Sequence, residues 1–112
     1  MTKVSATIKN GMPPIHPGVI LEKEFLLPLK VSAGKLAAHI GVTSARVYEI
    51  VSGKRGITAS TAIRLAAALG TTPEFWLNLQ TTHDLRVEEI SSKKEISKHI
   101  KLLPELEQVV DL

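Results

Sequence analysis

The chain has 112 residues, of which 44% are hydrophobic and 22% are charged, so it is long enough for one small globular domain with a single core. It contains no cysteine, which excludes disulfides, thiolate metal sites and a cysteine nucleophile. The apolar stretches are too short for a membrane span, and residues 1–5 lack the apolar core of a secretory signal, so we expect a cytoplasmic protein.

The net charge of +3 is unevenly distributed. Residues 1–70 contain nine Lys and Arg against three Glu, whereas residues 71–112 contain five Lys and Arg against eight Asp and Glu. This asymmetry fits ordinary solvated surface. It also fits a basic half that meets a polyanion and a second half that meets protein.

The first part of the chain predicts a tail and one short helix. Residues 1–12 show no periodicity and are expected to form a flexible N-terminal arm. The proline-rich stretch 12–18 is expected to be extended, with Pro17 in the first turn of an amphipathic helix that Pro28 ends. The expected inner face of this helix consists of Ile20, Leu21, Phe25 and Leu27.

Later helices are predicted from capping residues and stop signals. The expected N-caps are Ser32, Thr43, Thr58 and Thr72. The expected helices cover residues 33–40, 44–52, 59–69 and 73–89. The expected stops after the first three are Gly41, Gly53 and Gly70.

The sequence beyond the fifth predicted helix is less regular. Ser91 and Ser92 interrupt the pattern, after which Ile96, Ile100 and Leu103 recur at helical spacing. Since no stretch alternates with a period of two, the fold class is all-α. We expect a helical domain over residues 13–90 and a C-terminal helical tail over 91–112.

Two of the predicted helices, 33–40 and 44–52, are joined by three residues only. So short a connection sets the helices at a wide angle, as in a helix-turn-helix, although any two-helix corner of a small bundle has similar spacing. The turn requires a residue that tolerates a positive φ, and the crossing requires small and apolar side chains. The residues that meet these demands are Leu36, Ala37, Gly41, Val42, Val47 and Ile50.

The second of these helices would read bases if it entered a major groove. Ser44 can bond a base edge, Ala45 can pack on a thymine methyl, and Glu49 can accept from a cytosine amino group. Tyr48 flanks the same face. A carboxylate at Glu49 repels phosphates unless it pairs with a cytosine or with Arg46.

Phosphate contacts are predicted on both sides of this helix. Thr43, at the helix N-terminus, can hold a phosphate. Arg46 flanks the outer face. Lys54 and Arg55 follow the helix in a basic loop and can reach the backbone.

The histidines and the remaining motifs indicate no catalytic or metal chemistry. His16, His39, His83 and His99 are not spaced three or four residues apart, so no metal site is expected. His16 is expected to cap the first helix or to pack locally. The chain has no G-x-S-x-G, G-x-G-x-x-G or P-loop motif, so we expect neither an enzyme nor a cofactor.

A family resemblance rests on several stretches of the chain. Residues 36–54 resemble the Cro/C1-type helix-turn-helix of bacterial and phage repressors. The wider pattern, with PIHPG at 14–18, GKRGIT at 53–58 and TTPEFWLNLQ at 71–80, resembles the HigA-type antitoxins, also called VapI-like or plasmid-maintenance antidote proteins. The resemblance covers roughly residues 13–86.

The resemblance implies a five-helix, lambda-repressor-like DNA-binding domain that is usually dimeric. Such a protein neutralises an mRNA-cleaving toxin and represses the operon that encodes both. The chain departs from the pattern in two places. Ala33 and Gly34 stand where a phosphate-contacting Gln is common, and Ala45 stands where Ser or Arg is common, so no operator sequence can be transferred.

A dimer or partner surface is expected from the fifth predicted helix onward, because one short recognition helix reads only a few base pairs. Phe75 and Leu79 share a face and are expected in the core, whereas Trp76 fits either the core or a partner surface. The residues assigned to the dimer or partner surface are Trp76, Leu77, Leu85, Val87 and Ile90. A monomer, a stand-alone regulator without a toxin, and a protein-interaction module without DNA binding are the alternatives.

Overall fold

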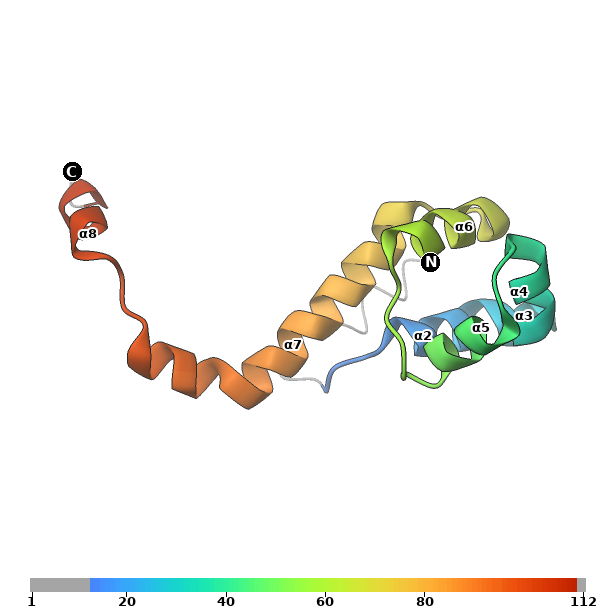
Figure 1. Cartoon of the computed structure of the whole chain (residues 1–112), viewed down its shortest axis with the longest axis horizontal. Helices are drawn as coiled ribbons and strands as arrows, with labels where there is room; N and C mark the ends of the chain where they lie inside the picture. Colours follow the sequence, from blue (N-terminus) through green and yellow to red (C-terminus); the bar gives the residue numbers. More distant parts are fainter. Residues whose placement is uncertain (1–12, 111–112) are drawn as a thin grey trace.

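The computed structural model describes residues 13–110, and every regular element in that range is a helix (Figure 1). The all-α prediction is therefore confirmed for the described part of the chain, and the expected N-terminal arm, residues 1–12, lies outside it. The elements in chain order are α2 (Pro17–Ile20), η1 (Leu21–Leu26), α3 (Leu27–Leu29), α4 (Ala33–Ile40), α5 (Ser44–Val51), α6 (Ala59–Leu69), α7 (Pro73–His99) and α8 (Pro104–Val110).

The predicted helix starts are confirmed. Each predicted N-cap accepts a hydrogen bond from the backbone N–H three residues later through its hydroxyl; these are Ser32, Thr43, Thr58 and Thr72. The helices α4 and α6 end as predicted at Gly41 and Gly70, whose φ angles are 76° and 72°. The helix α5 ends at Val51, one residue before the predicted end.

The first predicted helix has a different register. The element η1 is a π-helix, in which the N–H of Leu27 donates to the carbonyl of Glu22. Leu26 is buried and Leu27 is 62% exposed, so the prediction that Leu27 faces inward is wrong. The reason is that a π turn contains more residues than an α turn, which rotates Leu26 toward the face that carries Leu21.

Pro28 does not end this helix, contrary to the prediction, but lies inside α3. The preceding π turn gives its ring room, because in a regular α-helix that ring would clash with the carbonyl four residues earlier. The helix ends instead at Lys30, which has a left-handed φ of 56°. There the N–H of Val31 donates to the carbonyl of Leu26 over 3.0 Å, as at many helix C-termini.

The helix α7 is continuous over 27 residues and passes through Ser91 and Ser92, so the predicted interruption there is wrong. The hydroxyl of Ser91 donates to the carbonyl of Glu88 over 3.4 Å, and that of Ser92 donates to the Glu88 carboxylate over 2.5 Å. Serines bonded to the preceding turn of their own helix no longer compete with it. The second half of α7 leaves the bundle and leads to α8, so the chain measures 56 × 27 × 24 Å (Figure 1).

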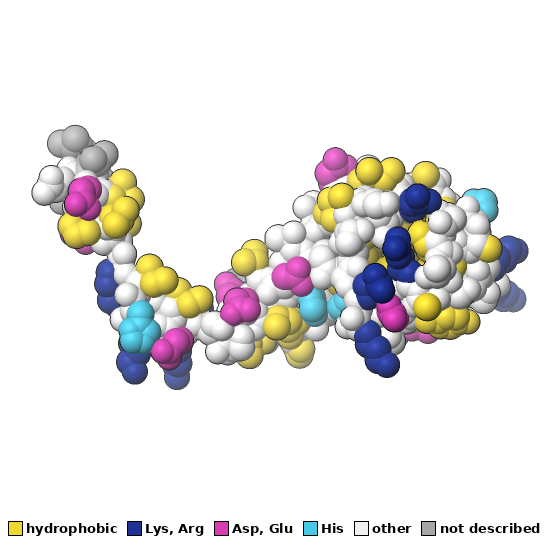
Figure 2. Space-filling model, viewed as in Figure 1, with side chains coloured by type: hydrophobic (Ala, Val, Ile, Leu, Met, Phe, Trp, Pro, Cys, Tyr) yellow, Lys and Arg dark blue, Asp and Glu magenta, His cyan; other side chains and the backbone are white. Residues whose placement is uncertain are grey.

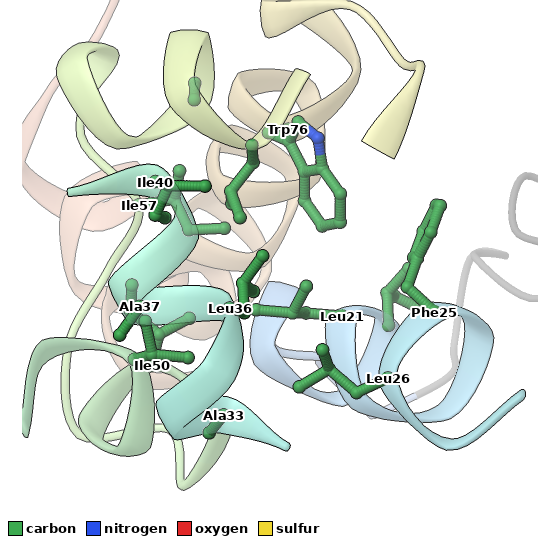
Figure 3. Close-up of a cluster of buried hydrophobic side chains, with 14 of the residues drawn as sticks. Leu21, Phe25, Leu26, Ala33, Leu36, Ala37, Ile40, Ile50, Ile57 and Trp76 are labelled. Atoms are coloured by element: carbon green, nitrogen blue, oxygen red, sulfur yellow. The ribbon is translucent and has the colours of Figure 1, made fainter. Parts of the chain in front are cut away.

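Trp76 lies at the centre of the core, with no exposed surface (Figure 3). Its ring centroid is 5.4 Å from that of Phe25, and its Nε1 donates to the hydroxyl of Thr71 over 2.7 Å. The assignment of Trp76 to a partner surface is therefore wrong, because packing and a satisfied N–H hold it inside. Leu79 is buried and Phe75 is partly buried, as predicted.

Candidate nucleic-acid interface

The two helices of the predicted turn meet closely. Gly41 ends α4 in the left-handed conformation, and the N–H of Val42 donates to the carbonyl of Ala37 over 3.0 Å. Ala37 and Val47 are each 1% exposed, so the small residue of α4 and the apolar face of α5 pack against each other. The structure also buries Leu36 and Ile50 and leaves Val42 partly buried.

A second contact fixes α5 from the side of α2. A Cβ built at Gly18 would lie 1.8 Å from the carbonyl oxygen of Ile50, so only glycine lets α2 approach α5 this closely. Sequence analysis did not assign this role to Gly18. The available signal was a glycine directly after Pro17, inside a predicted helix, where glycine is normally unfavourable.

The outer face of α5 carries the predicted base-contacting side chains. Ser44 and Ala45 are exposed, and they lie at the N-terminal end of the helix. Tyr48 is 57% exposed, and Glu49 is partly exposed one residue further along. A helix with short polar, small and hydrogen-bonding groups on one exposed face has the chemistry for contacting base edges in a major groove.

Glu49 is paired with Arg55 and not with Arg46. The Nε of Arg55 lies 2.7 Å from Oε1 of Glu49, and both side chains are roughly half exposed. This ion pair offsets the negative charge of Glu49 on the outer face of α5. It uses Nε of Arg55, and the two terminal nitrogens of the guanidinium group take no part in it.

The loop after α5 presents the predicted phosphate-contacting residues. Lys54 is exposed, and its N–H donates to the carbonyl of Glu49 over 2.8 Å, which fixes the start of the loop. The hydroxyl of Thr43 accepts from the N–H of Arg46 over 3.2 Å, so this oxygen caps α5. A phosphate at that end of the helix would therefore meet the remaining free backbone N–H groups rather than Thr43 alone.

Two further polar side chains hold these elements, and sequence analysis missed both. Arg64 on α6 donates from Nη1 to the carbonyl of Ile40 over 2.6 Å and so satisfies the C-terminal end of α4. Gln80 on α7 accepts from the N–H of Ile57 over 2.7 Å. Each contact joins residues more than twenty positions apart, and no local pattern marks either one.

His16 caps α2, as predicted, because its Nδ1 accepts from the N–H of Gly18 over 2.9 Å. Burial lowers the pKa of His16, and the ring of His83, with its centroid 5.0 Å away, lowers it further. Asp84 and a hydrogen bond with the backbone of Arg55 act in the opposite direction. The ring of His16 therefore joins α2 to the basic loop.

The side-chain charges are unevenly spread over the visible surface. Basic side chains gather on the bundle and again at the far end of the part of α7 that leaves it, whereas acidic and apolar side chains lie between these two groups (Figure 2). Among residues 13–110, no group of three or more His, Asp or Glu side chains is placed to hold a metal ion. No helix in that range combines the length and the hydropathy needed to cross a membrane.

Comparison with known proteins agrees with this geometry. A helix-turn-helix family model matches residues 23–76. Virulence-associated protein I of Dichelobacter nodosus is 49% identical over 81 residues, which cover 72% of this chain and 75% of that protein. Antitoxin HigA-1 of Vibrio cholerae is 44% identical over 77 residues, covering 69% of this chain and 72% of that protein. The solved structure of the Pseudomonas aeruginosa antitoxin HigA with the higBA promoter superposes with a TM-score of 0.78 at 40% identity, covering 80% of this chain and 98% of that one.

Proposed function

The chain belongs to the helix-turn-helix family that includes the HigA antitoxins and virulence-associated protein I, and from this we propose that it is a sequence-specific repressor that binds double-stranded DNA. The observation that carries the proposal is the outer face of α5, where Ser44, Ala45 and Tyr48 are exposed beside a basic loop. The solved relative with a bound promoter supports it. Such a protein acts where the DNA is, in the cytoplasm.

In the proposed complex α5 lies in the major groove. Its exposed residues contact bases, while the ends of the helix and the loop contact phosphates. The proposed base contacts are Ser44, Ala45, Tyr48 and Glu49. The proposed phosphate contacts are Thr43, Arg46, Lys54 and Arg55.

The proposed active species is a dimer that pairs through α7 and the segment after it. Leu85 and Ile90 are about 60% exposed and Val87 is 42% exposed. Contact between these apolar side chains and water is unfavourable, so a second protein surface that covers them would stabilise the helix. Leu77 is partly buried at the start of this stretch. Two paired chains would place two recognition helices on half-sites about 10 bp apart, or a multiple of that, which supplies specificity that one helix lacks.

We further propose that the chain is the antitoxin of a HigBA-like module, which represses its own operon and neutralises an mRNA-cleaving toxin. The family names of its relatives support this. The toxin would dock on exposed apolar surface of α7 and the segment after it, in competition with or beside the second copy. The additional exposed apolar residues there are Ile96, Ile100, Leu103 and Leu106.

Two measurements test these proposals. The purified chain should bind duplex DNA from upstream of its own reading frame more tightly than a random-sequence duplex, with an affinity that falls as salt rises. Co-expression with the product of the adjacent small reading frame should yield a stable complex and relieve growth arrest. Equal affinity for the two duplexes would contradict the proposal that the chain is a sequence-specific repressor. Specific DNA binding without any such complex would show a stand-alone regulator.

A further inference from the structure

The basic loop between α5 and α6 contains two glycines and is attached to the bundle at a few points. Gly53 has a φ of 81°, and Gly56 lies directly before the buried Ile57. Glycine increases the conformational freedom of a loop, so the position of Lys54 and Arg55 depends on contacts that hold its two ends. The carbonyl of Glu49 holds the first end, through the N–H groups of Lys54 and Arg55.

The second end of the loop is held by a side chain of α7. Oε1 of Gln80 accepts from the N–H of Ile57 over 2.7 Å, while Nε2 of the same amide donates to Oδ1 of Asp84 over 2.9 Å. An amide provides an acceptor and a donor at once, so both ends of the Gln80 group are used and its orientation is fixed. Asp84 lies one turn further along α7 and faces Gln80.

Gly56 provides the surface on which this amide rests. A Cβ built at Gly56 would lie 3.1 Å from both Cδ and Nε2 of Gln80 and 3.2 Å from Oε1, closer than ordinary van der Waals contact. A side chain at Gly56 would therefore require the Gln80 amide to shift by a few tenths of an ångström. Gly56 and Gln80 form one contact, although they lie on different elements.

We propose that Gln80 is a positioning residue for DNA binding: it fixes the loop of residues 53–57 so that Lys54 and Arg55 are held ready for the phosphates. The inference rests on the proposed function. Ile57 is only two residues from Arg55, so release of its N–H detaches the second end of the loop, while the carbonyl of Glu49 still holds the first end. A loop that is already ordered loses less conformational entropy when it binds. Gln80 would therefore strengthen the phosphate contacts of Lys54 and Arg55 although it does not itself contact DNA.

The test uses the full-length chain and a labelled duplex of about 30 bp from upstream of its own reading frame, long enough for two half-sites. Affinity is measured as a function of salt for the unmodified chain, Gln80→Ala, Lys54→Ala and the double variant. We expect Gln80→Ala to flatten the slope of log affinity against log salt by about one unit for each phosphate that the loop no longer neutralises. We also expect Lys54→Ala to cost much less in the Gln80→Ala background, because the charge is already displaced.

A second set of variants separates positioning from a general structural role. Gln80→Glu keeps the acceptor for Ile57 but places a carboxylate against Asp84, so it should weaken binding. Adding Asp84→Asn to Gln80→Glu lets the new amide at position 84 donate to the new carboxylate at position 80. The hydrogen bond between the two positions is then restored in the opposite direction, and the salt slope should return. Gly56→Ala crowds the amide without removing it, so it should change the slope in the same direction as Gln80→Ala but by less. Asn78→Ala, at an exposed amide on the same helix, should change nothing.

The outcomes are distinguishable. Salt-independent or absent binding by the unmodified chain would overturn the proposed function and the role of the loop with it. A normal salt slope in Gln80→Ala, or additive effects of Gln80→Ala and Lys54→Ala, would overturn the role of Gln80 alone. If Gln80→Ala does not fold, the Gln80→Glu chain with and without Asp84→Asn gives the same comparison, and failure of the rescue would also overturn it.

Discussion

Nε of Arg55 and Oε1 of Glu49 lie 2.7 Å apart across the C-terminal end of α5, so an acidic residue on the proposed recognition helix and a basic residue of the adjacent loop form one ion pair. The sequence alone predicts a base contact for Glu49 and a phosphate contact for Arg55, with no link between the two residues. The pairing couples them, because a change in one alters the charge that the other presents to DNA.

Glu49→Gln should therefore affect DNA binding in two ways. Binding to a random-sequence duplex should strengthen and its salt slope should steepen, because the carboxylate that offsets the charge of Arg55 at the interface is removed. Base preference should weaken at one position, where a good contact provides roughly 1–3 kcal/mol of discrimination. Titrations against a random duplex and a set of single-base variants would show both effects. Unchanged values in both would exclude Glu49 from the interface.

Lys54→Ala should weaken binding to all duplexes alike and flatten the slope of log affinity against log salt by about one unit. The reason is that the proposed partner of Lys54 is the phosphate backbone, which carries no sequence information. Lys98→Ala, an exposed lysine at the far end of α7, provides the matched control. If both variants kept the slope of the unmodified chain, the loop would not contact DNA.

Ser44→Ala should alter sequence preference more than general affinity, because Ser44 is exposed at the N-terminal end of α5. We expect a loss of roughly 1–3 kcal/mol of discrimination at one or two base pairs. Base-by-base competition against the promoter duplex measures this, with Ser97→Ala on α7 as the control. A preferred site that stays intact at every base would mean that α5 is not the recognition helix.

Local signals predicted the helix starts and the glycine ends of α4 and α6, whereas the ends of the first helix and of α7, and contacts between distant residues, could not be predicted. A threonine before an apolar run, as at Thr72, needs only its own helix to act as a cap. Trp76 is buried against Phe25, which lies 51 positions earlier in the chain. Helical spacing alone does not decide whether Trp76 faces the core or a partner surface. The contacts of Arg64 and Gln80 are distant in the same way.

The dimer interface proposed on α7 can be tested separately from the core. The double variant Leu85→Ser/Ile90→Ser should fold, because both side chains are exposed in one copy, but it should be monomeric because the apolar surface for the second copy is removed. Ile63→Ser, an exposed residue on α6 with 59% exposure, is the matched control and should remain dimeric. Sedimentation at micromolar concentration decides. A 12.2 kDa species from the unmodified chain, or a dimer from the double variant, would contradict the proposal.

His16 predicts a pH dependence of folding stability. Its pKa in the folded chain lies below the ordinary 6.5, mainly through burial, so the unfolded chain binds the additional proton more readily. The free energy of unfolding should therefore be highest above pH 6.5 and should fall as the pH drops from there toward the lowered pKa. Denaturant unfolding across this range measures it. His16→Asn keeps a capping acceptor without a titrating group, so this fall should become smaller; an unchanged profile would assign it to other groups.

The 27 residues of α7 span about 40 Å, of which only the first turns are packed into the bundle. Trp76 is buried near the start of the helix and His99 is exposed at its end, so a change of helix direction at Trp76 is magnified toward His99. A tilt of about 10° at Trp76 would move His99 by roughly 6 Å, since 23 residues of helix separate the two positions. In a dimer joined through α7, substitutions in the core around Trp76 would therefore change the distance between the two copies of α5. The repacking of a side chain that touches neither DNA nor partner would then alter the half-site spacing that the protein prefers.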